Sequence, residues 1–274
     1  MENKFMRDIF LLSLYEEMST NEKLFLITAD FGAPIIDKIK VEFANRFINV
    51  GIAEQNLINI SVGLALEGYT VYAYGIAPFI TMRCYEQIRV NMAILSSLKT
   101  LNINLIGVGL GVSYAMSGPT HHCLEDISIM KTLPNIEIFS PSDYLCVKEY
   151  FKRTIVLNQP KYLRFDATSM APLSFAIKDF EDGFRVLHKG VKIAIISTSF
   201  MVRKVLDIID NLDVALIDLH LITTYNKEKL QQELKSIDTI ITIEEGFKGC
   251  GGLDSEINFH FKNKNIINLG FNKN

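Results

Sequence analysis

Glu54 is a carboxylate whose position could serve acid–base chemistry. It opens a predicted helix that directly follows a predicted strand over residues 47–50. The apolar face of that helix is marked by Leu57, Ile60 and Leu64. The dipole of a helix favours a carboxylate in its first turn. Glu54 therefore fits either a proton-exchanging group or a first-turn acid with no further role, and the residues alone favour the second.

Two adjacent histidines, His121 and His122, are the next candidates. They lie in residues 109–123, a segment with enough glycine and proline to exclude a helix, so it is predicted to be a loop after a strand. Imidazole titrates near neutral pH, and loop residues often bind ligands or catalyse. Metal binding is not expected, because no third ligand accompanies the pair at a recognisable spacing.

A helix that begins with proline contributes a third set. Pro78 stands where a first-turn proline belongs, and Phe79, Met82 and Tyr85 share one face of the helix predicted over residues 78–96. Taken alone, this face indicates ordinary core packing.

The elements that must position these residues alternate between strands and helices, which predicts an α/β fold with parallel or mostly parallel sheets flanked by helices. In the first part, strands are predicted over residues 24–28, 47–50, 70–74, 104–109, 136–139 and 162–165, and helices over 7–18, 53–67, 78–96, 124–132 and 144–157. In the second part, the predicted strands are 191–197, 214–218, 239–243 and 266–269, and the predicted helices 200–211, 227–236 and 253–261. The sequence thus predicts domains at residues 1–168 and 190–274, joined by a linker over residues 169–189 where the periodicity lapses.

The composition is that of an ordinary globular protein. Of the 274 residues, 49% are hydrophobic and the net charge is −3, so the chain can bury a core and lacks the basic surface that nucleic-acid binding requires. The first residues predict neither a signal peptide nor a membrane span, and we expect a cytoplasmic location. The four cysteines are widely spaced and are expected to be free thiols.

Several motifs, in order and spacing, resemble those of one protein superfamily. Residues 49–56, Asn-Val-Gly-Ile-Ala-Glu-Gln-Asn, and residues 118–122, Gly-Pro-Thr-His-His, are similar to motifs of the pyrimidine-binding domain of transketolases. Further matching segments are residues 28–30, 78–79, 140–143 and 243–245. The resemblance covers nearly the whole chain, and the superfamily also includes deoxyxylulose-phosphate synthases and the beta subunits of 2-oxo acid dehydrogenases.

The resemblance implies thiamine diphosphate as the cofactor. Glu54 then corresponds to the glutamate that hydrogen-bonds the aminopyrimidine ring and favours its imino tautomer, while the cofactor supplies the carbanion chemistry. Phe79 and Tyr85 are expected to form the wall around that ring, with Met82 where the family often has a third aromatic. Ile52 and Asp30 are expected beside the cofactor.

The resemblance also implies substrate contacts. His121 is expected to contact the reacting carbonyl or hydroxyl, with His122 nearby. Arg7 is expected to bind a substrate phosphate, although a helix-surface arginine is an equal alternative. Arg164 resembles a phosphate-contacting arginine of deoxyxylulose-phosphate synthases, or it is simply a paired strand charge.

Three positions depart from the usual transketolase pattern. Ser117 stands where an aspartate reads a sugar hydroxyl, Gly109 where a histidine is usual, and Ala167 where an arginine binds phosphate. A site that has lost several polar contacts should prefer a different ketose or acceptor from the usual pentose phosphates.

The family's magnesium motif, Gly-Asp-Gly followed by an asparagine, does not occur in this sequence. A second polypeptide, the N-terminal or diphosphate-binding transketolase subunit, is therefore expected to hold the diphosphate and most of the Mg²⁺ contacts, in a heterotetramer. The implied activity is transfer of a two-carbon ketol unit between sugar or sugar phosphate substrates. The alternatives are a beta subunit of a 2-oxo acid dehydrogenase-type enzyme and a non-catalytic partner that retains the fold.

Overall fold

The first part of the chain forms a six-stranded parallel sheet. Its strands are β1 (Leu24–Thr28), β2 (Phe47–Asn49), β3 (Thr70–Ile76), β4 (Ile103–Val108), β5 (Glu137–Phe139) and β6 (Lys161–Phe165). They lie in the order β2-β1-β3-β4-β6-β5, and each neighbouring pair is parallel. This is a computed structural model, and it describes residues 2–173 and 180–273.

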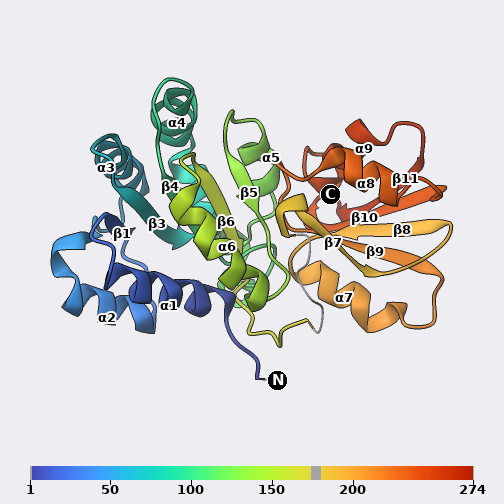
Figure 1. The fold of residues 1–274 in the computed structure, drawn as a ribbon, viewed down its shortest axis with the longest axis horizontal. Helices are drawn as coiled ribbons and strands as arrows, with labels where there is room; N and C mark the ends of the chain where they lie inside the picture. The colour runs from blue at the N-terminus through green and yellow to red at the C-terminus, as the bar shows by residue number, and fades with distance from the viewer. Residues whose placement is uncertain (1, 174–179, 274) are drawn as a thin grey trace.

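The second part forms a five-stranded sheet beside the first (Figure 1). Its strands are β7 (Phe184–His188), β8 (Ile193–Ser197), β9 (Val214–Leu219), β10 (Thr239–Phe247) and β11 (Asn265–Phe271). Their order is β11-β10-β8-β9-β7, parallel except that β7 runs antiparallel to β9. The predicted α/β class, with two mostly parallel sheets flanked by helices, is confirmed.

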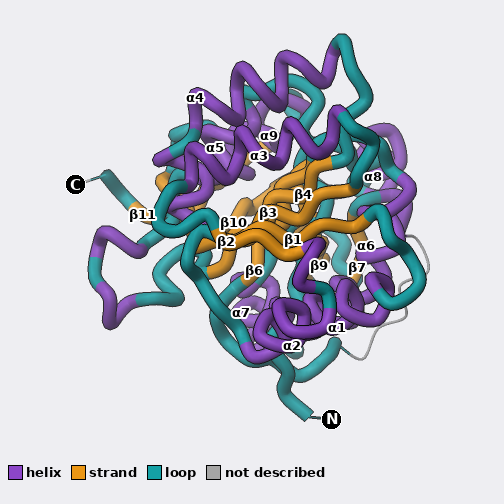
Figure 2. Tube along the Cα trace, turned by 90° about the vertical axis from the view of Figure 1, so that its left-hand side faces the viewer, coloured by secondary structure: helices purple, strands orange, loops and turns teal. Residues whose placement is uncertain are grey.

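Helices cover both faces of each sheet, as Figure 2 shows. On the first sheet, α1 (Met6–Met18), α2 (Pro34–Glu42) and α6 (Tyr144–Val156) pack on one face, and α3 (Glu54–Leu66) and α5 (Asp126–Lys131) on the other. On the second sheet, α7 (Phe200–Ile209) lies opposite α8 (Lys227–Glu233) and α9 (Leu253–His260). Because both faces are covered, every residue of β4 and β6 is buried.

The helix predicted over residues 78–96 is not a regular α-helix. It consists of the π-helical segment Phe79–Arg83, one α-turn (Tyr85–Gln87), a second π-helical segment (Ile88–Ile94) and a 3-10 turn (Leu95–Ser97). A π-helix widens the turn and changes which side chains share a face, and such segments are frequent at functional sites. Phe79 and Tyr85 therefore point to different neighbours, although regular helical spacing predicted one shared face.

Two elements were not predicted from the sequence. Helix α2 falls in a stretch with no predicted element, and strand β7 falls inside the predicted linker over residues 169–189. That linker prediction is wrong at its C-terminal end, because β7 belongs to the second sheet. Residues 174–179 of the predicted linker lie outside the described part of the chain.

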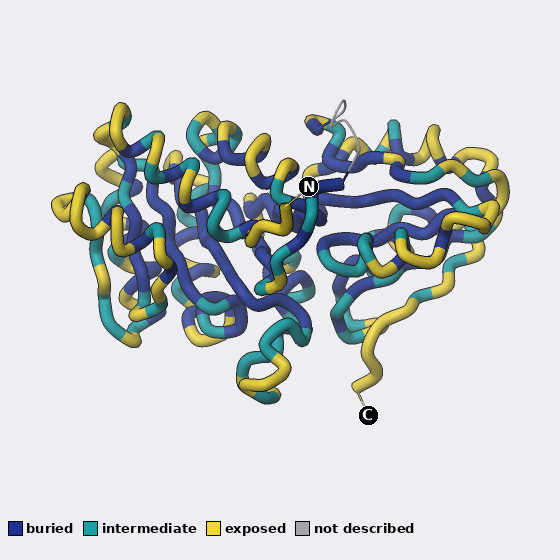
Figure 3. Tube along the Cα trace, turned by 90° about the horizontal axis from the view of Figure 1, so that it is seen from below, coloured by how far each residue is buried: buried dark blue, intermediate teal, exposed yellow. Residues whose placement is uncertain are grey.

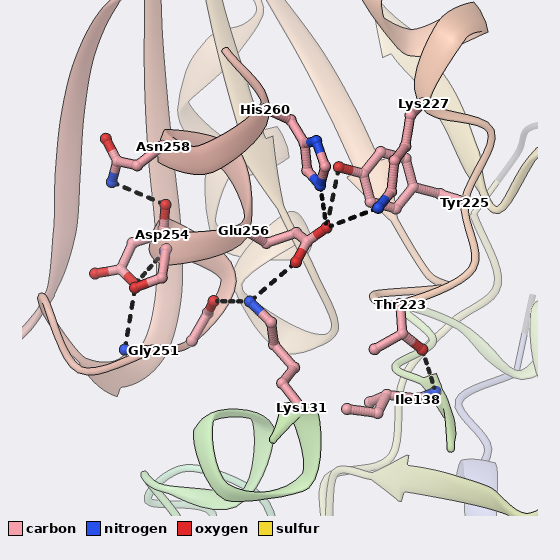
Figure 4. A network of polar contacts seen from close by, with 12 residues as sticks. Lys131, Ile138, Thr223, Tyr225, Lys227, Gly251, Asp254, Glu256, Asn258 and His260 are labelled. Atoms are coloured by element: carbon pink, nitrogen blue, oxygen red, sulfur yellow. Dashed lines mark hydrogen bonds and ion pairs between the residues drawn. The ribbon is translucent and has the colours of Figure 1, made fainter. Parts of the chain in front are cut away.

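The two sheets share a continuous interface. One apolar cluster includes Leu105 and Met130 from the first part together with Ile217 and Ile257 from the second, and in Figure 3 buried residues continue from one sheet to the other. Polar contacts reinforce it, as Figure 4 shows for Lys131, whose ammonium lies 3.1 Å from the carboxylate of Glu256 on α9. The second part therefore holds α5, and the loop before it, from behind.

Candidate functional site

The predicted site residues gather at the carboxyl ends of β2, β3 and β4. The chain passes from β1 outward to β2, then returns past β1 to β3 and β4. Ligands of open α/β sheets bind where the strand order reverses in this way, beyond the carboxyl ends of the strands. The topology thus brings Glu54, Phe79 and His121 to one edge from segments far apart in the sequence.

Asn49 braces the turn that leads to Glu54. Its side-chain oxygen accepts hydrogen bonds from the backbone N–H groups of Asp30 (3.1 Å) and Gly51 (3.0 Å), and its amide donates to Asp30 Oδ1 (3.2 Å). Gly51 has a φ of +72° and Asp30 a φ of +54°, so both ends of the brace use the left-handed region, which costs least for glycine. This positioning role of Asn49 was not predicted, although the residue lies in the recognised motif.

Glu54 is the first residue of α3 and is only 7% exposed. Its Oε1 accepts a hydrogen bond from Arg83 Nη1 at 3.0 Å. With Ile52, Ala53, Gln55, Asn56 and Arg83, it lines a surface hollow of about 510 Å³. A carboxylate at a helix start, buried yet open to a hollow, can exchange a proton with a bound group.

Phe79 joins this carboxylate to the histidine loop. The guanidinium carbon of Arg83 lies 3.7 Å from the centre of the Phe79 ring, and the ring of His121 meets Phe79 edge to face with centroids 5.1 Å apart. Both neighbours of Phe79 are thus in place to line a flat ligand. Arg83 was not predicted as a site residue, but its place four residues after Phe79 carried a signal, since such pairs meet on a helix.

His121 ends a short 3-10 turn (Pro119–His121) that begins after Gly118, whose φ is +77°. The Nδ1 atom of His121 pairs with the hydroxyl of Thr120 at 3.0 Å. His122 points the other way, because its Nε2 atom is buried and has no hydrogen-bond partner among the described residues. Only His121 touches Phe79, so the structure separates the two adjacent histidines.

The other predicted cofactor residues lie at different depths. Ile52 is 76% exposed on the rim of the hollow, and Met82 is also exposed. Tyr85 reaches α5 instead, where its hydroxyl donates to the carbonyl of Ile129 (3.1 Å) and lies 2.5 Å from Thr132 Oγ1. Its hydroxyl thereby anchors the irregular helix to α5.

The two predicted substrate arginines differ sharply. Arg7, near the start of α1, is half-buried and donates from Nε to Asp8 at 2.7 Å. Arg164 is buried on β6, forms a two-pronged ion pair with Asp126 (2.7 and 2.9 Å) and donates to Ser140. All three of its nitrogens are therefore used, which favours the alternative of a paired strand charge over a phosphate contact.

The departures from the family pattern have a structural counterpart. Gly109 has a φ of +90°, and a Cβ atom there would lie 2.1 Å from the ring of Tyr114. Tyr114 therefore covers the backbone at the position where the sequence pattern led us to expect a histidine side chain. A hydroxyl on a ring replaces an imidazole at this side of the site, and this changes which substrate groups it can bind.

Glu245 of β10 contacts the same loop from the second sheet. A Cβ at Gly111 would lie 2.6 Å from its carboxylate, and burial, helped by the nearby charge of Asp166, raises the pKa of Glu245 to about 7. Within the described residues, no group of three or more His, Cys, Asp or Glu side chains is arranged to hold a metal ion. No helix of the described part is long and apolar enough to cross a membrane.

Comparison with known proteins agrees with this arrangement. The family described as "Transketolase, pyrimidine binding domain" matches residues 3–171. One of the two subunits of an apulose-4-phosphate transketolase from Actinobacillus succinogenes is 31% identical over 79% of this chain and 71% of its own length. A 6-deoxy-6-sulfo-D-fructose transketolase subunit from a Clostridium species is 23% identical over 93% of this chain and 80% of its own length.

A solved structure shows the same fold over almost the whole chain. It is described as "Split gene transketolase, inactive beta4 tetramer", and it superposes with a TM-score of 0.85 over 99% of this chain and 90% of its own, at 24% identity. The family match spans more than half of the chain and contains Glu54, Phe79 and His121. The chain belongs to the transketolase family.

Proposed function

We propose that this chain is the pyrimidine-binding subunit of a two-subunit, thiamine diphosphate-dependent transketolase. The observation that carries the proposal is the meeting of Glu54, Phe79 and His121 at one sheet edge, with the buried carboxylate and the His121 ring on either side of the phenyl ring. Its relatives include subunits of two transketolases with unusual ketose substrates.

The residues present fit the aminopyrimidine half of thiamine diphosphate. The guanidinium of Arg83, a flat group with N–H donors, already lies against the Phe79 face and bonds Glu54, so the same two groups suit a flat ring bearing nitrogen donors. Glu54 would hold the ring nitrogen, and Phe79 the ring face. When bound, thiamine diphosphate supplies a thiazolium carbon that stabilises the carbanion needed for ketol transfer.

The chain's own residues would then control protons and orientation. Glu54 shares a proton with the bound ring, which a carboxylate at hydrogen-bonding distance can do. Since Thr120 pairs with Nδ1 of His121, Nε2 is the atom that we assign to the substrate oxygen, where it would donate or accept a proton. Phe79 would fix that imidazole and exclude water between the two groups.

A partner polypeptide would supply the diphosphate and Mg²⁺ contacts. Support comes from the sequence, which lacks the Gly-Asp-Gly motif, and from a relative that is itself named as a subunit. The expected assembly is a heterotetramer with two copies of each chain. Loss of polar groups at Ser117, Gly109 and Ala167 supports an altered sugar specificity, as does Tyr114 over Gly109.

The test is co-expression with a neighbouring gene product that carries Gly-Asp-Gly. Binding of thiamine diphosphate and transfer from a panel of ketose donors, phosphorylated and not, are measured for each chain alone and for the mixture. We expect turnover only from the mixture, with poor use of xylulose 5-phosphate and ribose 5-phosphate. Full turnover by this chain alone would overturn the two-subunit proposal, and cofactor binding without turnover on any donor would favour a non-catalytic partner.

A further inference from the structure

Arg83 occupies both of the groups that the proposed function gives to the cofactor ring. Its Nη1 atom donates to Glu54 Oε1 at 3.0 Å, and its guanidinium carbon lies 3.7 Å from the centre of the Phe79 ring. Its backbone carbonyl accepts a hydrogen bond from the side chain of Gln55 at 3.3 Å. Arg83 thus links the start of α3 to the π-helical segment that carries Phe79.

The chemistry of this arrangement matches that of an aminopyrimidine ring. A guanidinium is planar, stacks on aromatic faces and donates N–H groups to carboxylates within its own plane. An aminopyrimidine would stack on the same face and bond the same oxygen. The two groups cannot be on Phe79 and Glu54 together, because each would fill the same few ångströms between them.

We propose that Arg83 is a positioning residue that caps the pyrimidine half-site, holding Glu54 and Phe79 in place until the cofactor ring displaces its guanidinium. This inference rests on the proposed function. It goes further by naming the group that competes with the cofactor, and it gives a reason for an arginine in a position that faces a cationic cofactor.

The cap is built to open. The Arg83 side chain is 48% exposed, whereas the Glu54 side chain is 8% exposed, so the arginine can turn into solvent while the carboxylate stays in place. Ion pairs with one exposed partner contribute little stability. The π-helical geometry of Phe79–Arg83 leaves the last residue of the segment at the edge of the hollow, where displacement needs no change in the core.

Cofactor affinity tests the cap directly. Thiamine diphosphate with Mg²⁺ is titrated calorimetrically into the assembled two-subunit complex of wild type, Arg83→Ala, Arg83→Lys and the control Arg89→Ala, which removes an exposed arginine from the adjacent segment. We expect Arg83→Ala to bind about three- to tenfold more tightly, since it lacks the competing contacts. Arg83→Lys should fall between it and wild type, and Arg89→Ala should match wild type.

The outcomes separate this inference from the proposed function. Unchanged or weaker binding by Arg83→Ala, with wild type binding normally, overturns the cap and makes Arg83 a cofactor contact or a bystander. Absence of binding by every variant overturns the proposed function and the cap with it.

A second readout needs neither cofactor nor partner. In the single chain, the Arg83 side-chain protons should show an upfield NMR shift from the Phe79 ring, and this shift should vanish in Phe79→Leu. Arg83 protons at their ordinary positions in wild type would contradict the stacked cap.

Discussion

The rings of Phe79 and His121 meet edge to face, with their centroids 5.1 Å apart. One ring follows β3 and the other ends the loop after β4, so the contact joins two motifs that are more than forty residues apart in the sequence. Because Arg83 and Glu54 lie on the other side of Phe79, this phenyl ring is the centre of the site. Its removal should affect both halves.

Phe79→Ala should weaken thiamine diphosphate binding to the assembled complex about three- to tenfold, because an aromatic contact is lost together with the support of the His121 ring. Calorimetric titration measures the change. Phe259→Ala removes an exposed phenyl ring from α9 and serves as the control. Equal affinities of Phe79→Ala and wild type would remove Phe79 from the cofactor wall.

Glu54→Gln should lower ketol transfer by the complex about a hundredfold or more, since a proton-sharing carboxylate becomes an amide. The fold should be unchanged, because glutamine has the same shape and can still bond Arg83. Steady-state turnover and circular dichroism report the two effects. Glu86→Gln changes an exposed acid on the neighbouring turn, and similar turnover in both variants would refute the role of Glu54.

Glu245 should make stability fall as the pH rises. Burial raises its pKa from 4.5 to about 7, so the folded chain holds the proton more firmly than the unfolded chain. The stabilisation is complete below pH 4.5 and is lost as the pH passes through about 7, amounting to about 3 kcal/mol. Urea unfolding at a pH of about 5.5 and of about 8, on either side of the raised pKa, measures it.

In Glu245→Gln that pH-dependent loss should shrink markedly, because the amide imitates the protonated acid. The exposed Glu228→Gln on α8 is the matched control and should follow wild type. A Glu245→Gln profile parallel to wild type would show that another group causes the pH dependence.

Arg185 should be essential for joining the two sheets. It lies buried on β7 and donates to Asp143 (2.6 Å) and Asp218 (2.8 Å), which come from opposite sides of the interface. Arg185→Ala leaves both carboxylates without their cation and should cost about 3–5 kcal/mol in unfolding free energy. Urea unfolding against the exposed Lys192→Ala is the comparison, and a loss below about 1 kcal/mol would contradict the role.

The sequence predicts the residues whose signals are local. Glu54 and His121 stand in short motifs, and the strands that carry them have apolar runs that are easily recognised. Strand β7 escaped because its second residue is the buried Arg185, which interrupts the apolar pattern and makes sense only beside Asp143 and Asp218. Arg164 looked like a ligand for the same reason, since its partner Asp126 lies 38 residues away.

Helix α2 does carry a local signal, because Pro34 at its start and the apolar pair Ile36 and Ile39 mark a short helix. Arg83 and Asn49, by contrast, needed three-dimensional contacts. Each bonds a residue 19 to 29 positions away, and neither contact follows from local spacing.

A crystal structure of the assembled two-subunit complex with thiamine diphosphate and Mg²⁺ tests the central claim most directly. The measured quantity is the distance from a Glu54 carboxylate oxygen to the nearest nitrogen of the aminopyrimidine ring. We predict a hydrogen bond of about 2.6–3.2 Å, with the ring on Phe79 and Arg83 turned away. A ring bound elsewhere, with Glu54 still paired to Arg83, would contradict the account.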